Sequence, residues 1–158
     1  VEKHGTPADD IDIIVSSSTG VTTTFVGTPT GTATSTAATI GNLTVSENAQ
    51  LTIDATLKLA VAGDIKVAGT MTTEENMVGM TADNMTIVEN GAATFGERND
   101  VTGTTLAVSN TIDVQEGGTL TLTGSVSAGT NALVTCTKLV EGGSFPNGKP
   151  DVVAPAAN

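Results

Sequence analysis

The sequence predicts an all-β protein, and within that class a β-solenoid of short strands. Apolar residues alternate with polar ones in short runs along most of the chain, which is the period of a strand. No segment repeats apolar residues at helical spacing over three turns. The 158 residues include no Trp, no Tyr and only three Phe. The core must therefore come from small and β-branched side chains, which suit closely stacked strands.

Residues 1–40 are predicted to form an extended Thr/Ser-rich N-terminal arm. Its residues 16–39 have low complexity, although apolar residues alternate within the arm. One interpretation is a flexible linker or an O-glycosylated stalk. The other is an arm that adds as a strand to a neighbouring subunit, because an exposed sheet edge has unpaired backbone groups. The residues expected to mediate this assembly are Ile11, Ile13, Val15, Val21 and Phe25.

Residues 41–142 are predicted to form a repetitive β domain. Strands are expected around the alternating apolar residues, with Gly, Asn and Glu-Gly turns between them. Residues 73–82 carry the best helical signal, and we expect a loop or a single turn there. The apolar residues that mark the expected strands are Leu43, Val45, Leu51, Ile53, Leu57, Leu59, Val61, Ile65, Val67, Met85, Ile87, Leu106, Val108, Ile112, Val114, Leu120 and Leu122.

Similar segments recur along the repetitive domain at two different spacings. The segments NLTVSENAQLTI, NMTIVENGAATF and TIDVQEGGTLTL begin at Asn42, Asn84 and Thr111, so their starts lie 84 − 42 = 42 and 111 − 84 = 27 residues apart. Glu47, Glu89 and Glu116 occupy the same place in the three segments. A finer period of about 21 residues, within the range of solenoid coils, connects Leu43, Ile65, Met85, Leu106 and Val126. The two spacings do not agree everywhere, so the coil boundary stays open.

A β-sandwich or jelly roll with a donated strand is the alternative fold, because short strands with frequent turn signals fit it as well. Residues 143–158 contain Pro146, Pro150 and Pro155. They are expected to form a tail without strands that could cover a sheet edge.

Charge and composition argue against several functions. The net charge is −11 and only six residues are basic, so neither nucleic acid nor an anionic membrane surface is an expected partner. No apolar stretch approaches the roughly 18 residues that span a bilayer, and membrane insertion is not expected. The single cysteine, Cys136, excludes an internal disulfide. It lies in an alternating apolar run, which predicts a buried and unreactive thiol.

No catalytic site and no organic cofactor are expected. The only histidine is His4, so a Ser or Cys nucleophile would lack its usual base. Calcium is the one cofactor left open, because oxygen-rich clusters suit it. Solvated charge is the favoured interpretation of these clusters, since their spacing matches no defined calcium loop. The calcium candidates are Asp9, Asp10, Asp12, Glu97, Asn99 and Asp100.

Asn42-Leu43-Thr44 and Asn84-Met85-Thr86 are glycosylation acceptor sequences. The two asparagines occupy the same position of the repeat. The alternative is that Asn42 and Asn84 stack as a ladder or shape a turn.

Residues 40–135 resemble the β-solenoid repeats of secreted surface proteins, such as autotransporter passengers and haemagglutinin-type adhesins. The runs LTVSENAQLTI and IDVQEGGTLTLTGSV carry the resemblance, and bactofilin-type cytoskeletal solenoids share this style. It implies extracellular display, adhesion or scaffolding without an active site. The GGxGxD pattern of calcium-binding β-rolls is missing. The chain begins at Val1 and not at Met, from which we expect a mature extracellular protein after removal of a signal peptide.

The function expected from these features is that of a non-catalytic structural subunit of an extracellular filament, sheath or surface layer. Copies of the chain would assemble by strand addition through the N-terminal arm and the exposed sheet edges. The alternatives are an adhesin or fibre stalk, a binding module, and a bactofilin-like cytoskeletal scaffold.

Overall fold

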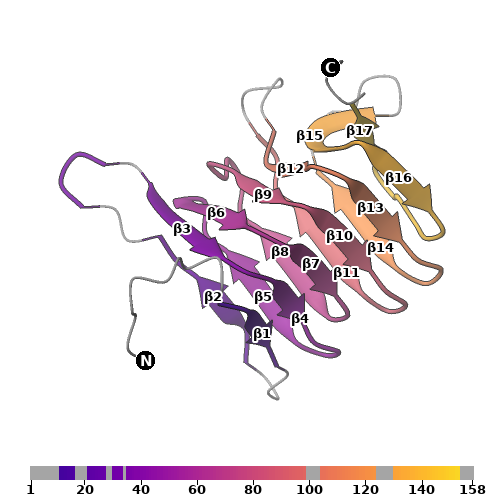
Figure 1. Ribbon diagram of the computed structural model, residues 1–158, viewed down its shortest axis with the longest axis horizontal. Helices are drawn as coiled ribbons and strands as arrows, with labels where there is room; N and C mark the ends of the chain where they lie inside the picture. Colours follow the sequence, from indigo (N-terminus) through magenta and orange to yellow (C-terminus); the bar gives the residue numbers. More distant parts are fainter. Residues whose placement is uncertain are drawn as a thin grey trace.

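The computed structural model describes residues 11–16, 21–27, 30–33, 35–98, 104–123 and 130–153. All regular elements in these ranges are strands, and they form three parallel sheets that run along the molecule (Figure 1). The predicted all-β class is therefore confirmed. The chain passes through sheets A, B and C in turn, and each passage is called a circuit below. Because of this order, strands along most of the chain pair with the third strand before and the third strand after them. At the C-terminal end the chain goes from a strand of sheet A to a strand of sheet C without a strand of sheet B between them, so the last strand pairs with the second strand before it.

The strands of each sheet follow one another in chain order. Sheet A contains β1 (Ile13–Val15), β4 (Leu43–Val45), β7 (Asp64–Val67), β10 (Asn84–Ile87), β13 (Thr111–Val114) and β16 (Lys138–Glu141). Sheet B contains β2 (Thr23–Phe25), β5 (Gln50–Ile53), β8 (Thr70–Thr73), β11 (Ala92–Phe95) and β14 (Thr119–Leu122). Sheet C contains β3 (Thr36–Ile40), β6 (Leu57–Val61), β9 (Met80–Ala82), β12 (Leu106–Val108), β15 (Thr130–Cys136) and β17 (Lys149–Val152).

All strand pairs among the described residues are parallel. Parallel neighbours need a long connection between them, and here the other two sheets provide it. Sandwiches and jelly rolls consist of antiparallel sheets. The described sheets therefore do not fit the alternative fold, whereas they are compatible with a β-solenoid.

The register shows where the predicted repeat holds. Leu43 pairs with Ile65, and Ile65 pairs with Met85, at steps of 65 − 43 = 22 and 85 − 65 = 20 residues. Met85 then pairs with Ile112, a step of 112 − 85 = 27. The period of about 21 residues is thus wrong beyond Met85, because Leu106 lies in sheet C opposite Met80. Val126 lies outside the described residues.

The cause is a difference in loop length between sheets B and C. Residues 54–56 connect β5 to β6, whereas residues 96–105 connect β11 to β12. Arg98 in the longer connection donates from Nη1 to the carbonyl oxygens of Met77, at 2.8 Å, and Thr104, at 3.2 Å. Residues 74–79 form a loop between β8 and β9, but the expected loop or turn over residues 73–82 is too long, because Thr73 ends β8 and Met80–Ala82 forms β9. The 27-residue spacing between repeats was the correct one in this region.

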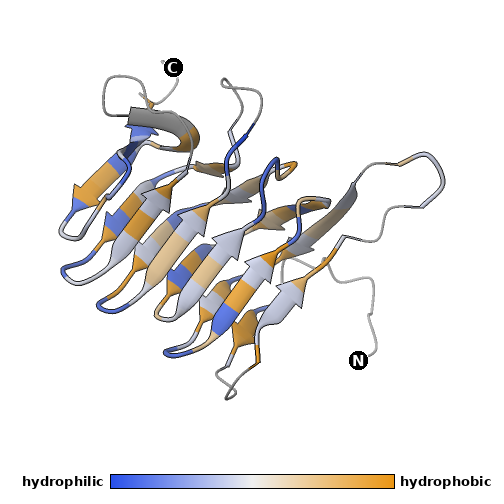
Figure 2. Ribbon diagram, turned by 180° about the vertical axis from the view of Figure 1, so that it is seen from behind, coloured by the Kyte–Doolittle hydropathy of each residue, from blue (hydrophilic) through white to orange (hydrophobic). Residues whose placement is uncertain are grey.

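Inward-facing side chains of successive strands stack in apolar columns. In sheet A, Leu43, Ile65, Met85 and Ile112 form one such column, and each is fully buried. The alternation of apolar and polar residues along the strands is visible in Figure 2. Phe95 is the largest buried side chain and takes a column position in sheet B. The core is therefore a series of stacked layers, built mainly from aliphatic side chains as the composition predicts.

The three aligned glutamates lie in equivalent tight turns between sheets A and B. In each turn, the residue after the glutamate has a positive φ: 63° at Asn48, 65° at Asn90 and 80° at Gly117. Asn and Gly tolerate this conformation best. A backbone hydrogen bond closes each turn, for example from Gly91 N to Val88 O at 2.9 Å. The predicted equivalence of Glu47, Glu89 and Glu116 is confirmed by this geometry.

The edges of the sheets come from the two ends of the chain. β1, β2 and β3, all within the predicted arm, pair with β4, β5 and β6 of the same chain. At the other end, Lys149–Val152 forms β17, so the expectation of a tail without strands is wrong for these residues. An edge strand tolerates Pro150 because proline lacks only an N–H group that an edge need not pair. Among the described residues, none lies in a helix long and apolar enough to cross a membrane.

Candidate functional site

A column of polar residues follows the corner at which the chain enters sheet A. Each member stands directly before the first inward apolar residue of a strand, from Asp12 before Ile13 to Lys138 before Leu139. We call this set the polar corner column. It contains Asp12, Asn42, Asp64, Asn84, Thr111 and Lys138.

Hydrogen bonds connect the successive members of the polar corner column from Asp12 to Thr111. Asp12 Oδ1 accepts from the backbone N and from Nδ2 of Asn42, both at 2.9 Å. Asn42 Oδ1 accepts from Asp64 N at 2.8 Å, and Asp64 Oδ1 accepts from Asn84 Nδ2 at 2.9 Å. Asn84 Oδ1 accepts from Thr111 N at 3.2 Å. Because amides alternate with carboxylates, each carboxylate has a donor beside it and no like charge directly next to it.

The two predicted glycosylation acceptors thus belong to one ladder. Asn42 and Asn84 lie two circuits apart, with Asp64 between them, and each side-chain amide donates to a carboxylate. This is the stacked arrangement expected as the alternative to glycosylation. Glycosylation itself stays a prediction. Asp64 and Lys138 were not predicted as members, although their place before an alternating apolar pair is shared with Asn42 and Asn84.

The N-terminal end of the stack is rich in exposed apolar side chains. Ile13 and Phe25 are half-buried against the core, and Val15 is buried. Ile11 is 40% exposed and Val21 is 56% exposed. All five predicted assembly residues therefore lie in the first circuit, within or beside β1 and β2.

The C-terminal end has a similar character. Val140, Val152 and Val153 are exposed there. Glu141 and Lys149 form an ion pair with Nζ and Oε2 2.5 Å apart. Phe145 packs against the end of the core.

Exposed large apolar side chains concentrate at these two ends. Among the described residues, the exposed examples are Ile11, Ile14, Val21, Val26, Val78, Val140, Val152 and Val153. Every one except Val78 belongs to the first or the last circuit. The sides of the stack, in contrast, present mainly Thr, Lys, Asp, Asn and Ala. The two ends are therefore the part of the described surface best suited to bind another apolar surface.

The calcium candidates do not come together in the described structure. Asp12 belongs to the polar corner column, and Glu97 is exposed in the connection after β11. Asp9, Asp10, Asn99 and Asp100 lie outside the described residues. Within the described ranges, no group of three or more His, Cys, Asp or Glu side chains could hold a metal ion. Calcium binding stays a prediction.

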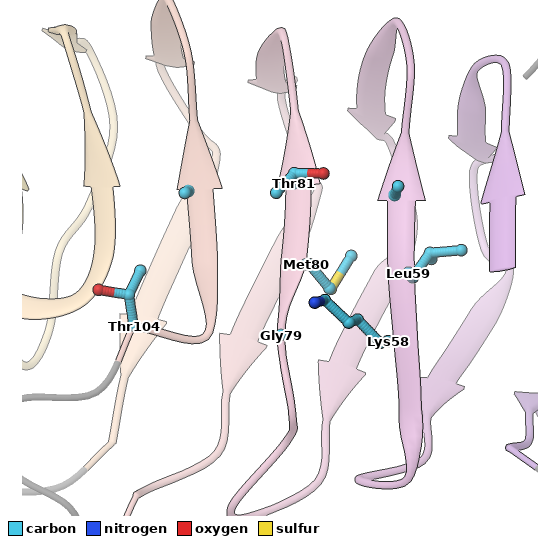
Figure 3. Close-up of a pocket in the computed structure, with 8 residues that line it drawn as sticks. Lys58, Leu59, Gly79, Met80, Thr81 and Thr104 are labelled. Carbon is cyan, nitrogen blue, oxygen red and sulfur yellow. The ribbon is translucent and has the colours of Figure 1, made fainter. Parts of the chain in front are cut away.

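Two hollows lie on the sides of the stack. The first, of about 210 Å³, crosses β6, β9 and β12 on sheet C and has a mainly apolar lining, with Lys58 extending from β6 toward Met80 (Figure 3). The second, of about 550 Å³, lies beside sheet B and is lined by Glu74, Glu75 and Glu97 with several threonines. These glutamates give the second hollow an acidic margin.

Two ionisable groups have perturbed pKa values. Burial raises the pKa of the Cys136 thiol, although a backbone hydrogen bond with Ile112 partly opposes this change. Cys136 is 1% exposed, which confirms the prediction of a buried thiol. The exposed carboxylate of Asp54 accepts from the hydroxyl and the backbone N–H of Thr56, and these bonds lower its pKa.

Comparison of the chain with protein-family models, curated proteins and solved structures finds no match.

Proposed function

We propose that the chain is a β-solenoid that serves as a non-catalytic structural subunit of an extracellular filament, sheath or surface layer. Copies would assemble through the sheet edges at the two ends of the stack. The observation that carries the proposal is the concentration of exposed large apolar side chains in the first and last circuits. An end that combines strand edges with apolar side chains favours association with another copy.

The backbone supports the same conclusion. β1, β2 and β3 at one end and β16 and β17 at the other each have a sheet neighbour on one side only. A parallel strand can add to such an edge without a change in the sheet. Because the strands of the predicted arm already pair within their own chain, assembly would use the edges that these strands present. An exchange of strands between copies would lead to the same contacts.

A structural role also agrees with the sides of the stack. The apolar residues of the described strands are used in stacked columns. The extracellular location rests on the resemblance to secreted surface proteins. An adhesin or fibre stalk is the alternative, and such a stalk would not require polymerisation.

Sedimentation of the purified chain tests the proposal. We expect the chain to form polymers that resist heat and detergent, because each junction would extend two or three continuous sheets. The matched control is a variant with Ile14→Asp and Val152→Asp, which places a charge at each end without a change in the core. A wild-type chain that remains a stable monomer at every accessible concentration would contradict the proposal.

A further inference from the structure

We propose that copies join head to tail in one register, with β16 of one copy beside β1 of the next and β17 beside β3. The polar corner column then continues across the junction, from Lys138 to Asp12 of the next copy. This inference rests on the proposed function, since it specifies how the ends of the stack meet. It is carried by the charges and the apolar side chains at the two ends.

The polar corner column has opposite charges at its ends. Asp12 begins the column and is exposed at the N-terminal edge. Lys138 ends the column and is exposed at the C-terminal edge, opposite Thr111 of the preceding strand. Head-to-tail stacking brings the ammonium group of one copy next to the carboxylate of the other. Contact between like ends would instead leave the Lys138 ammonium group without the Asp12 carboxylate as its partner.

The neighbouring columns of sheet A fit the same register. Leu139 would lie beside Ile13 of the next copy, and both side chains are half-buried against the core. Val140, 38% exposed, would lie beside Ile14 of the next copy, which is 66% exposed. The junction would thus cover apolar side chains that face water in the monomer, and their burial favours association.

Sheet C gives the same alignment independently. Ile40 pairs with Val61 at the N-terminal edge, and Cys136 pairs with Val152 at the C-terminal edge. These residues belong to one inward column, which also contains Ala82 and Val108. In a head-to-tail stack Val152, 51% exposed, would lie beside Ile40 of the next copy. The register proposed for sheet A therefore also brings apolar side chains together in sheet C.

One inward column of sheet A would not bring two apolar side chains together at the junction. Glu141 occupies the column position of buried Val114 and would lie beside Val15 of the next copy. Lys149 already neutralises Glu141 within the same copy, and both side chains are about half exposed. The ion pair limits the cost of placing a carboxylate in this column.

Two charge reversals, studied alone and mixed, test the register. In Asp12→Lys and in Lys138→Glu, every junction of a pure assembly brings like charges together. We expect each pure variant to raise the critical concentration for assembly about ten-fold, which corresponds to about 1.4 kcal/mol per junction. In an equimolar mixture the two variants alternate, and every junction pairs opposite charges again. The mixture should assemble at a critical concentration close to that of wild type. The difference in critical concentration between each pure variant and wild type should shrink at high salt.

The mixture separates a role at the junction from a role in folding. Asp12→Lys also removes the hydrogen bonds to Asn42, but mixing cannot repair a defect within one chain. The control variants are Asp83→Lys and Lys66→Glu, which make the same charge changes away from the ends and should behave as wild type. Suppose that wild type polymerises. If both reversals then have the same critical concentration as these controls, or if mixing the two variants does not restore assembly, the register is wrong and the proposed function stands. If wild type does not polymerise, the proposed function fails first.

Discussion

At the scale of single residues, several polar side chains among the described residues are paired in a short local motif, and others are stacked in a column. Asp54 is an example of the first kind. Its carboxylate accepts from the Thr56 backbone N–H at 2.7 Å and from the Thr56 hydroxyl. These two bonds stabilise the ionised carboxylate and lower its pKa below the ordinary value of 3.8. The folded state is therefore stabilised at pH values above 3.8, and this contribution is lost as pH falls through the lowered pKa.

Replacement of Thr56 by valine should raise the pKa of Asp54 towards its ordinary value. The hydroxyl donor is the larger cause of the shift, whereas the backbone donor is retained, so the return should be partial. Carboxyl chemical shifts followed through an NMR pH titration measure this pKa directly. Thr52→Val on the outer face of β5 is the control and should leave Asp54 unchanged. An Asp54 pKa that is the same in Thr56→Val and wild type would refute the assigned cause.

Replacement by valine should change the stability of the fold in opposite directions at two buried threonines. Thr105 is fully buried, and its hydroxyl has no hydrogen-bond partner among the described residues. Valine keeps its shape and removes the unpaired hydroxyl, so Thr105→Val should stabilise the fold by about 1 kcal/mol. The hydroxyl of Thr73 accepts from the buried N–H of Gly96 at 3.0 Å. Thr73→Val leaves that donor unpaired and should destabilise the fold by about 1–3 kcal/mol.

Urea denaturation followed by circular dichroism measures both effects. The pair of variants controls for the loss of a hydroxyl group, because only the partner differs. Equal changes in the midpoint for Thr105→Val and Thr73→Val would show that hydrogen-bond pairing does not determine the sign.

At the scale of elements, the corners between sheets C and A depend on close approach of the backbone. A Cβ atom at Gly63 would collide with Asn42 Oδ1, which accepts the hydrogen bond from Asp64 N. Gly63→Ala should therefore displace the Asn42 side chain and destabilise the fold by about 1–3 kcal/mol. Thermal or urea denaturation provides the measurement.

A double-mutant cycle checks this explanation. In Asn42→Ala the obstructing side chain is absent, so the additional cost of Gly63→Ala should become small. If the two substitutions are instead additive, the collision with Asn42 is not the cause of the destabilisation.

The elements also show what the sequence could and could not predict. Alternation located the strands around Leu43, Ile65 and Met85, because one face of each strand is buried. The same alternation occurs in all three sheets, so it does not indicate to which sheet a strand belongs. Leu106 was therefore assigned to the wrong column, since the long connection at 96–105 shifted the period. The equivalent turns at Glu47, Glu89 and Glu116 were predictable because Asn or Gly must follow.

At the scale of the whole molecule, the candidate site depends on register, which a local pattern does not contain. Asp12 and Lys138 are separated by nearly the whole described chain, and only the order of six strands in sheet A places them at opposite ends of one column. The exposed valines of the last circuit were not predicted, because Pro150 argued against a strand there. Assembly through the first circuit could be predicted from its apolar residues. They alternate as in a strand, but they are too few to form a large core by themselves.

The whole molecule then has a defined length along the direction of strand stacking. Sheet A contains six strands, and neighbouring strands lie about 4.8 Å apart, so head-to-tail stacking gives about 29 Å per subunit. The apolar columns would continue from one copy to the next, except at the Glu141 position. The proposed polymer is therefore polar, with strands perpendicular to its axis and no closed symmetry at the junction.

Electron cryomicroscopy of the assembled chain tests this central claim most directly. The account predicts filaments, or layers of filaments, with a subunit rise of about 29 Å along the direction in which strands stack about 4.8 Å apart. Density at each junction should show β16 beside β1 of the next copy and Lys138 near its Asp12. Assemblies in which the copies contact one another through their sides, with free sheet edges at both ends, would contradict it.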